Sequence, residues 1–181
     1  MVESTSSTAP EVPSTTRGPV TPGTAKEYTD ALVRNFAEDP DNKGLLDATQ
    51  AACVAPKWVE AVTPARFGKA GITPEDLAAQ RSMTAFTLLD LTLPEAEGLV
   101  RQMRGCGVDV LERSLAAASS SGDETNPKVR ACLKEKVSDD LMDRMVAVGL
   151  SGKYEDPTVQ ATGKEFVSVL NACGVYPNGG N

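Results

Sequence analysis

The chain has 181 residues, of which 40% are hydrophobic and only 4% aromatic, and its formal net charge is −7. A core built mainly from Ala, Leu, Val and Met favours helices, because sandwiches and barrels usually depend on β-branched and aromatic side chains. The acidic balance argues against nucleic-acid binding through phosphate neutralisation, and the absence of histidine excludes Ser-His-Asp or Cys-His catalysis and His-ligated metal sites within this chain.

The N-terminal segment, residues 1–24, is dominated by Ser, Thr, Pro and Gly. Such a composition buries too little surface to recover its ordering entropy, so we interpret the segment as a disordered tether. We expect any signal or lipid-attachment segment of the precursor to lie outside this sequence, and no apolar run here is long enough to span a bilayer. We favour the tether of an exported protein over a cytosolic protein with an unstructured N-terminus.

Helical periodicity begins at residue 25, and no convincing alternating strand pattern is present. Residues 25–37 predict a helix, residues 38–44 a loop, and residues 45–62 a second helix that breaks or kinks near Pro56, which lacks the interior N–H. Pro at a first helical position and Thr or Asp at capping positions mark two further helix starts, and a Gly marks a stop between them. These residues are Thr63, Pro64, Gly71, Thr73, Pro74 and Asp76.

A helix over residues 93–106 is predicted next, with its apolar face formed by Leu93, Ala96, Val100 and Met103. The second half of the chain shows the same order of signals. Residues 108–118 predict a helix and residues 119–125 a loop, and helices over 128–137, 139–149 and 156–174 follow. Their expected caps and stops are Asn126, Ser138, Gly149 and Gly174.

An internal repeat organises these elements, since residues 28–53 can be laid on residues 107–132 without a gap. Each copy reads as a helix, a loop, a cysteine-bearing helix, a helix that stops at Gly, and a last helix that ends in Cys-Gly-Val. We therefore divide the chain into repeat 1 (25–106), repeat 2 (107–176) and a flexible C-terminus (177–181). Repeat 1 carries extra sequence within residues 73–92. The alternative is chance similarity between Ala- and Leu-rich helices.

The four cysteines suggest two disulfide bridges, for which three connectivities exist. The repeat favours Cys53–Cys106 and Cys132–Cys173, because each bridge would close one copy and tie its second helix to its last. A structural zinc or a catalytic redox pair is disfavoured, since both normally place two cysteines a few residues apart. Four buried free thiols remain the alternative. Disulfides would place the protein outside the cytosol.

The cysteines, the stop glycines and the sequences around them resemble exported proteins and lipoproteins of actinobacteria. In that family, tandem helical copies with two cysteines each follow a Ser/Thr/Pro-rich tether. The resemblance covers roughly residues 28–176, and its motifs include Cys53-Val54-Ala55-Pro56, Gly105-Cys106-Gly107-Val108 and Ala172-Cys173-Gly174-Val175. It implies an extracytoplasmic, lipid-anchored location and a scaffold without an assigned activity. No lipobox cysteine is present in this sequence.

Two acidic segments are candidates for metal binding or acid–base chemistry. Asp39, Asp41 and Gly44 occupy the first, third and sixth positions of a calcium loop, but Lys43 and Gln50 stand where oxygen ligands are needed. An acidic surface turn is therefore the favoured interpretation. Asp139, Asp140 and Asp143 could form a carboxylate cluster, but acidic residues in a first helical turn also interact favourably with the helix dipole, which we favour.

Two further sites are weaker. Ser119–Ser121 lack a neighbouring base and fit a loop. Lys57 and Trp58 are a candidate partner contact, because an exposed Trp beside a Lys is a typical docking spot. A single Trp is more often a core residue, and we favour that alternative for Trp58.

We therefore predict an all-α protein of two related disulfide-closed helical repeats, packed as one compact unit behind a disordered tether. We expect no catalytic residue, cofactor or metal. The favoured function is a non-catalytic, extracytoplasmic cell-envelope domain, membrane-associated only through an anchor, that binds a protein partner or membrane complex as an accessory subunit. The alternatives are a carrier of a small apolar or lipid ligand and, less favoured, a carboxylate-dependent hydrolase using Asp140 and Asp143.

Overall fold

The computed structural model describes residues 18–38, 46–79, 82–120 and 126–175, with only the backbone of 82–84 and 116–120. The described residues form helices and no strand, which confirms the predicted all-α class. The helices are α1 (Ala25–Glu38), α2 (Ala48–Val62), α3 (Pro64–Lys69), α4 (Pro74–Ala79), α5 (Ser82–Thr87), α6 (Leu93–Gly105), α7 (Val110–Ser120), α8 (Pro127–Lys136), α9 (Asp139–Ser151) and α10 (Pro157–Ala172).

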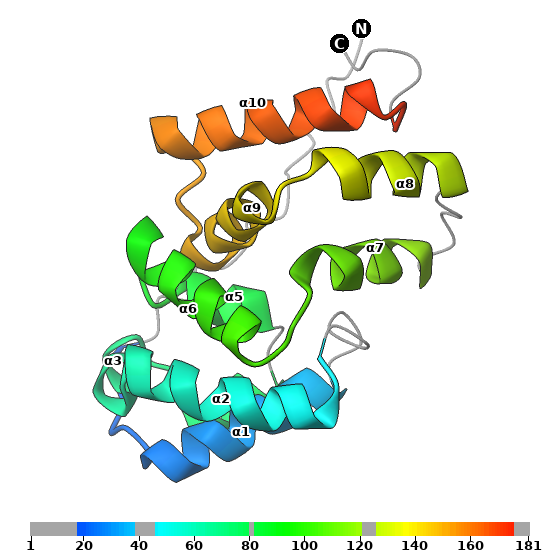
Figure 1. The fold of residues 1–181 in the computed structure, drawn as a ribbon. Helices are drawn as coiled ribbons and strands as arrows, with labels where there is room; N and C mark the ends of the chain where they lie inside the picture. The colour runs from blue at the N-terminus through cyan, green and yellow to red at the C-terminus, as the bar shows by residue number, and fades with distance from the viewer. Residues whose placement is uncertain (1–17, 39–45, 80–81, 121–125, 176–181) are drawn as a thin grey trace, which may run out of the picture.

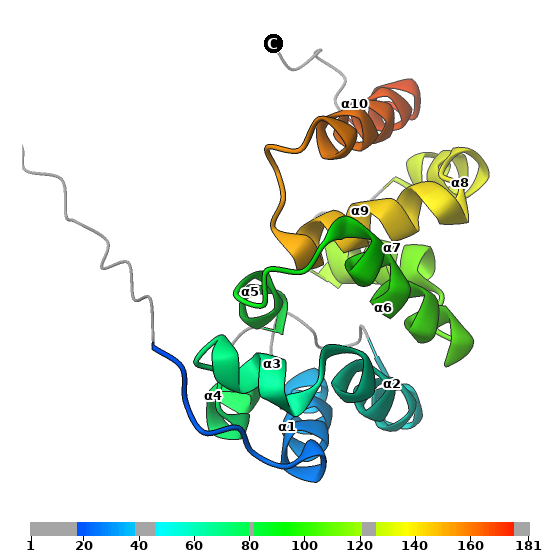
Figure 2. The ribbon, with the colours of Figure 1, turned by 90° about the vertical axis from the view of Figure 1, so that its left-hand side faces the viewer.

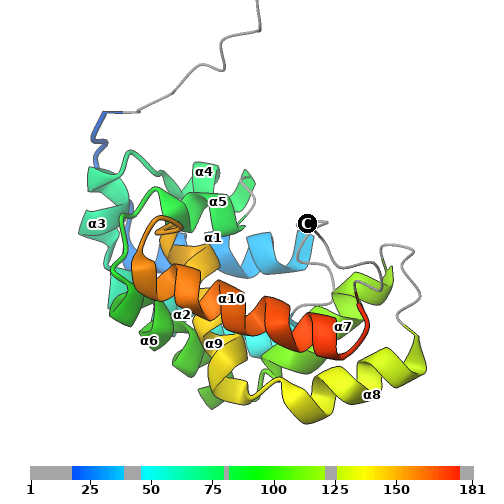
Figure 3. The ribbon, with the colours of Figure 1, turned by 90° about the horizontal axis from the view of Figure 1, so that it is seen from above.

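The two predicted copies lie at opposite ends of one compact body. Helices α1–α4 form one end and α8–α10 the other, with α5, α6 and α7 between them (Figures 1 and 2). Seen from above, α10 crosses over α9 (Figure 3). The copies are joined chiefly where α6 and α5 pack against α9. Arg104 of α6 reinforces this junction through an ion pair with Asp143 of α9, whose carboxylate lies 2.7 Å from the guanidinium.

Most of the core's aromatic side chains gather in the first copy. Tyr28 stacks on Phe67 at 4.6 Å between ring centroids, and Trp58 meets Phe86 edge to face at 4.8 Å. These rings lie among buried aliphatic side chains from α1, α2, α4, α5 and α6. The second copy buries fewer residues, because α8 contributes Leu133 as its one fully buried residue and α10 buries only a short stripe. The first copy is therefore the denser part of the described chain.

Both predicted disulfides are present, Cys53–Cys106 and Cys132–Cys173, with Cα–Cα distances of 5.8 and 5.6 Å. The prediction of one bridge per copy is confirmed, and none of the four cysteines is a free thiol. Each bridge links the second helix of a copy, α2 or α8, to the end of its last helix, α6 or α10. The bridges are compatible with an oxidising, extracytoplasmic environment.

The Cys-Gly-Val triplets close their helices by the same hydrogen bonds. Gly107 and Gly174 both adopt a φ of +74°, and their N–H groups donate to the carbonyl three residues earlier at 2.9 and 3.0 Å. Val108 and Val175 donate to the carbonyl five residues earlier at 3.2 and 3.0 Å. This pattern is a Schellman motif, in which a left-handed residue turns the chain back and satisfies the last carbonyls. The triplets are therefore helix stops, as the sequence predicted.

Three local predictions need correction. Gly149 does not end α9, which runs to Ser151 and stops at Gly152, where φ is +64°. Of the break or kink predicted near Pro56, the break is wrong, since α2 runs from Ala48 to Val62 with Pro56 exposed inside it. Thr63 occupies the N-cap position of α3 with Pro64 behind it, but its side chain makes no capping bond and its φ is +73°.

The extra sequence of the first copy, residues 73–92, contains α4 and α5. It starts as predicted, with Thr73 Oγ1 accepting from the N–H of Asp76 at 3.1 Å and Asp76 bonding back to Thr73 N–H at 3.2 Å. Asn35 and Tyr28 of α1 donate to the carbonyls of Leu77 and Ile72, which fixes this insert against α1.

Only the last part of the predicted tether falls within the described residues. Residues 18–24 run across α3, where the N–H of Val20 donates to the carbonyl of Gly68 at 2.9 Å. A Cβ on Gly68 would lie 2.9 Å from Pro22, so this crossing requires a glycine in α3. Residues 1–17 and 177–181 lie outside the described chain. Within it, every helix is too short or too polar to cross a bilayer.

Candidate functional site

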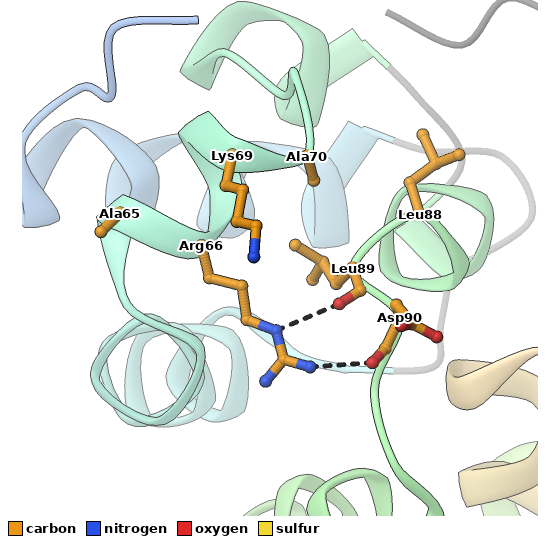
Figure 4. Close-up of a pocket in the computed structure, with 7 residues that line it drawn as sticks. All are labelled: Ala65, Arg66, Lys69, Ala70, Leu88, Leu89 and Asp90. Carbon is orange, nitrogen blue, oxygen red and sulfur yellow. Dashed lines mark hydrogen bonds between the residues drawn. The ribbon is translucent and has the colours of Figure 1, made fainter. Parts of the chain in front are cut away.

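A surface hollow of about 530 Å³ lies between α3 and the turn that joins α5 to α6 (Figure 4). Its lining comes from one turn of α3 and from the α5–α6 turn, namely Ala65, Arg66, Lys69, Ala70, Leu88, Leu89 and Asp90. The α3 wall is held by Pro64 at its start and by Gly71 at its end, whose φ of +72° closes the helix. A volume of this size lies within the range of about 300–1,000 Å³ typical of ligand sites.

Arg66 holds the hollow's two walls together. Its Nε donates to the carbonyl of Leu89 at 3.0 Å, and its Nη2 donates to the carbonyl of Asp90 at 2.9 Å (Figure 4). Its Nη1 also lies 2.6 Å from the carboxylate of Glu95, in the first turn of α6. The guanidinium therefore satisfies carbonyls after α5 and a carboxylate of α6 together, which leaves it a structural group with its donors already engaged.

Glu95 is the strongest electrostatic partner in this frame. The hydrogen bond from Arg66 lowers the pKa of Glu95 from 4.5 to about 2, and hydrogen bonds from Thr92 add to the shift. Thr92 and Glu95 form a capping box at the start of α6, because each side chain bonds the other's backbone N–H. The carboxylate thus secures the helix start and the wall of the hollow at once.

A second contact ties the α5–α6 turn to the loop between α9 and α10. Lys153 pairs with Asp90, and this pairing lowers the pKa of the Asp90 carboxyl. Asp90 itself adopts a left-handed φ of +48°. Gly152 brings the loop close, since a Cβ there would lie 3.2 Å from Thr87. The second copy therefore braces one edge of a hollow that the first copy builds.

Two large apolar side chains flank this joint. Leu88 is 51% exposed on the α5–α6 turn, and Tyr154, which follows Lys153, is 59% exposed. In the described part of the chain, the exposed large apolar residues are Leu88, Tyr154 and Val167. Leu88 and Tyr154 lie in the two loops that the Asp90–Lys153 pair connects. Leu88 therefore adds exposed apolar surface to the lining of the hollow, and Tyr154 exposes an aromatic ring on the loop that pairs with the α5–α6 turn.

A smaller hollow of about 220 Å³ lies on the other side of Arg66, between α2 and α6. Gln102 lines it, and its Oε1 is buried without a hydrogen-bond partner in the described structure. Because that atom is closed off from solvent, a molecule in the hollow could not reach it without a movement of the side chain. The lining of the smaller hollow is mainly apolar, and the charged groups in it, Arg66 and Glu95, are paired with each other.

Of the candidate partner contact at Lys57 and Trp58, only Lys57 is exposed at the surface. Trp58 is 3% exposed, and its indole N–H donates to the carbonyl of Leu99 at 2.9 Å. It is thus a core residue, and its proposed role as an exposed docking residue is wrong. Lys57, its neighbour on α2, is exposed.

The acidic cluster at the start of α9 is divided between two arginines. Asp139 and Asp143 pair with Arg104 at 2.8 and 2.7 Å, whereas Asp140 pairs with Arg144 at 3.0 Å. Arg144 also binds Glu165 of α10 at 3.1 Å, so these pairs connect helices. Within the described residues, no group of three or more acidic or cysteine side chains is placed to hold a metal ion.

Several sequence candidates are only partly visible. Asp39, Asp41, Lys43 and Gly44 of the calcium-like loop lie outside the described residues, while Gln50 bonds Asp47 in a capping box. Of Ser119–Ser121, only the backbone of the first two is described, at the end of α7. Neither segment adds a placed side chain to the site.

The residues of the hollow carry no recognisable sequence signal. Lys69 and Leu88 are separated by a glycine stop and two short helices, and neither belongs to a motif. Only the Thr-Pro signals flanking α3 and α4 hinted at closely spaced helix ends in this region. No protein-family model, curated protein or solved structure matches the chain.

Proposed function

We propose that the chain is a non-catalytic binding domain of the bacterial cell envelope, located outside the cytoplasm and tethered to the membrane, that engages a protein partner as an accessory subunit. The observation that carries this proposal is the hollow between α3 and the α5–α6 turn. Arg66 and Lys153 hold its walls, Leu88 exposes apolar surface in its lining, and Tyr154 is exposed on the loop that braces it. A rigid surface with exposed apolar groups favours protein docking over chemistry.

Four of the charged groups near the hollow act as braces. Arg66, Glu95, Asp90 and Lys153 all have partners within the fold. This pairing is typical of a scaffold that presents a surface, and it supports the proposal that no reaction is catalysed here. The two disulfides support the extracytoplasmic location, because such bridges persist in oxidising compartments.

Photo-crosslinking in the native host tests the proposal. A photoreactive amino acid would replace Leu88 or Tyr154 in the full-length protein, and Lys128, exposed on α8, would serve as a control position. We expect one partner of defined mass at both test positions and not at Lys128. No adduct in native membranes, or the same adducts at all three positions, would contradict the proposal. Free-thiol labelling of the unreduced protein should find all four cysteines blocked.

The alternative function is that of a carrier of a small apolar or lipid ligand. Native mass spectrometry of the purified protein would then show a bound mass, or uptake of a fatty acid offered in solution. No contact in the described structure favours this function over partner binding.

A further inference from the structure

Lys69 is the one charged group of the larger hollow without a partner in the described structure. Arg66 is engaged by Glu95 and by backbone carbonyls, and Asp90 is paired with Lys153. The side chain of Lys69 extends from α3 toward the space between Arg66 and Leu89 (Figure 4). The hollow thus presents a single uncompensated positive charge on a chain whose net charge is −7.

The walls around this ammonium group are apolar. Ala65 and Ala70 line the α3 side, and Leu88 and Leu89 line the opposite side. Leu89 is buried at 3% exposure and forms a fixed floor, whereas Leu88 is 51% exposed. An occupant that matches these walls therefore needs an apolar group close to a negative charge.

We propose that the hollow binds an acidic, apolar segment of a protein partner, with an Asp or Glu carboxylate on Lys69 and a neighbouring apolar side chain against Leu88 and Leu89. This inference rests on the proposed function and specifies the chemistry of the partner. A peptide segment fits better than a small anion, because the hollow opens to solvent and its apolar lining extends onto Leu88, which is exposed at the surface. Its single free ammonium offers too little charge for a polyanion.

Charge complementarity gives this contact its selectivity. The chain as a whole repels acidic partners, but at physiological ionic strength that repulsion is screened beyond about 8 Å. The partner's carboxylate would contact Lys69 well within that distance, and the apolar walls would partly shield this contact from water. Local attraction therefore outweighs the long-range repulsion, and basic segments are excluded by Lys69 itself.

A peptide selection tests the inference with defined probes. A phage library of random dodecapeptides would be selected on the oxidised full-length chain at physiological salt, and the recovered peptides synthesised. We expect sequences in which Asp or Glu stands beside Leu, Ile, Val or Phe. Lys69→Glu should weaken the best peptide by about tenfold or more, and Leu88→Ser should weaken it as well. Lys69→Arg, which keeps the charge, should retain most of the binding.

Lys164→Glu is the matched control, since Lys164 is an exposed lysine of α10 at the other end of the molecule. It makes the same change in net charge and should leave affinity within about twofold. Lys69→Arg should unfold at the wild-type temperature. Lys69→Glu places an acid in the last turn of α3 and should lower that temperature by no more than about 4 °C. Amide shifts on titration should cluster at residues 65–70 and 88–90.

Peptides without an acidic residue, peptides that bind Lys69→Glu as well as wild type, or no selected peptide at all would overturn the inference. The two proposals fail separately. If the partner cross-linked at Leu88 is still captured by the Lys69→Glu protein, the inference is wrong and the proposed function stands. If no cross-linked partner exists, the proposed function fails.

Discussion

At the scale of single residues, glycine with a positive φ determines where the helices stop. Gly107, Gly152 and Gly174 all lie in the left-handed region, with φ between +64° and +74°. Gly149 lies inside α9 instead, since the buried residues Leu150 and Ser151 continue the helix beyond it. A sequence pattern shows that a stop glycine is near, but the residue that actually turns the chain depends on how far the buried face extends.

Exchange of glycine for alanine should distinguish a glycine that ends a helix at positive φ from a glycine inside a helix. Gly107→Ala should lower the free energy of unfolding by about 1 kcal/mol, because an L-residue is strained at positive φ. No atom lies within 4 Å of the added Cβ, so a clash does not contribute. Gly163→Ala, inside α10 and equally open, should raise stability by up to about 1 kcal/mol. Urea unfolding of the oxidised proteins measures both, and shifts of the same sign would contradict this account.

At the scale of the elements, capping residues were predictable and packing was not. Asn126, Ser138 and the Thr73–Asp76 pair cap their helices as expected, because each bond joins residues two or three apart in sequence. The continuity of α2 through Pro56 was missed, since it depends on how α2 packs along α1. Pro56 and Ala52, whose carbonyl loses its helical donor, are both exposed, so water can satisfy that carbonyl.

The candidate site could not be predicted from the sequence, because it too depends on how the helices pack. Arg66 bonds carbonyls more than twenty residues away, on a turn whose position depends on the packing of α5. No periodicity or motif brings these groups together. Sequence reasoning favoured the correct core alternative for Trp58, because a lone Trp usually finds its place in the core.

The ion pair between Arg66 of α3 and Glu95 of α6 makes the stability of the fold at acidic pH depend on Glu95. Its pKa in the folded protein is about 2 against an ordinary 4.5, so its stabilising effect is complete above pH 4.5 and is lost as the pH falls toward 2. The side chain is 45% exposed, so screening limits the effect to about 1 kcal/mol. Glu95→Gln should lower stability at neutral pH by that amount and reduce the loss between these pH values.

The Gln variant keeps the helix cap, because Gln serves in a capping box, as Gln50 does at the start of α2. Glu97→Gln is the control on the same helix, since Glu97 lies 3.8 Å from an exposed arginine. Thermal unfolding across the acidic range measures the difference from wild type. An equal effect of both variants would show that Arg66 is not the cause.

At the scale of the whole molecule, the two disulfides support unequal halves. The first bridge lies in the dense copy with the aromatic cluster, while α10 is held in the second by Val159, Thr162 and Cys173 as its most buried residues. The repeat in the sequence predicted both pairings. It could not show that the first copy buries more side chains than the second, because the insert that contributes α4 and α5 to one copy has no counterpart in the other.

Removal of the first bridge should therefore affect the protein differently from removal of the second. In the chain-entropy description, each bridge contributes about 4 kcal/mol for loops of this length. Cys132→Ser with Cys173→Ser should release α10 and raise hydrogen exchange there, while the fluorescence of Trp58 stays that of a buried indole. Cys53→Ser with Cys106→Ser should shift Trp58 emission at lower denaturant. Equal loss of the Trp58 signal in both variants would contradict this division.

The path of residues 18–24 across α3 has a mechanical consequence. Because Val20 is bonded to Gly68, a force applied through the N-terminal segment reaches α3 before any other helix. The bridges span sequence separations of 53 and 41 residues and do not interlock. At about 3.5 Å per residue, they keep roughly 190 and 140 Å of contour length from being extended. A pulled, oxidised molecule would therefore lengthen only through the chain outside its bridges, and most of each copy would remain shielded from the load.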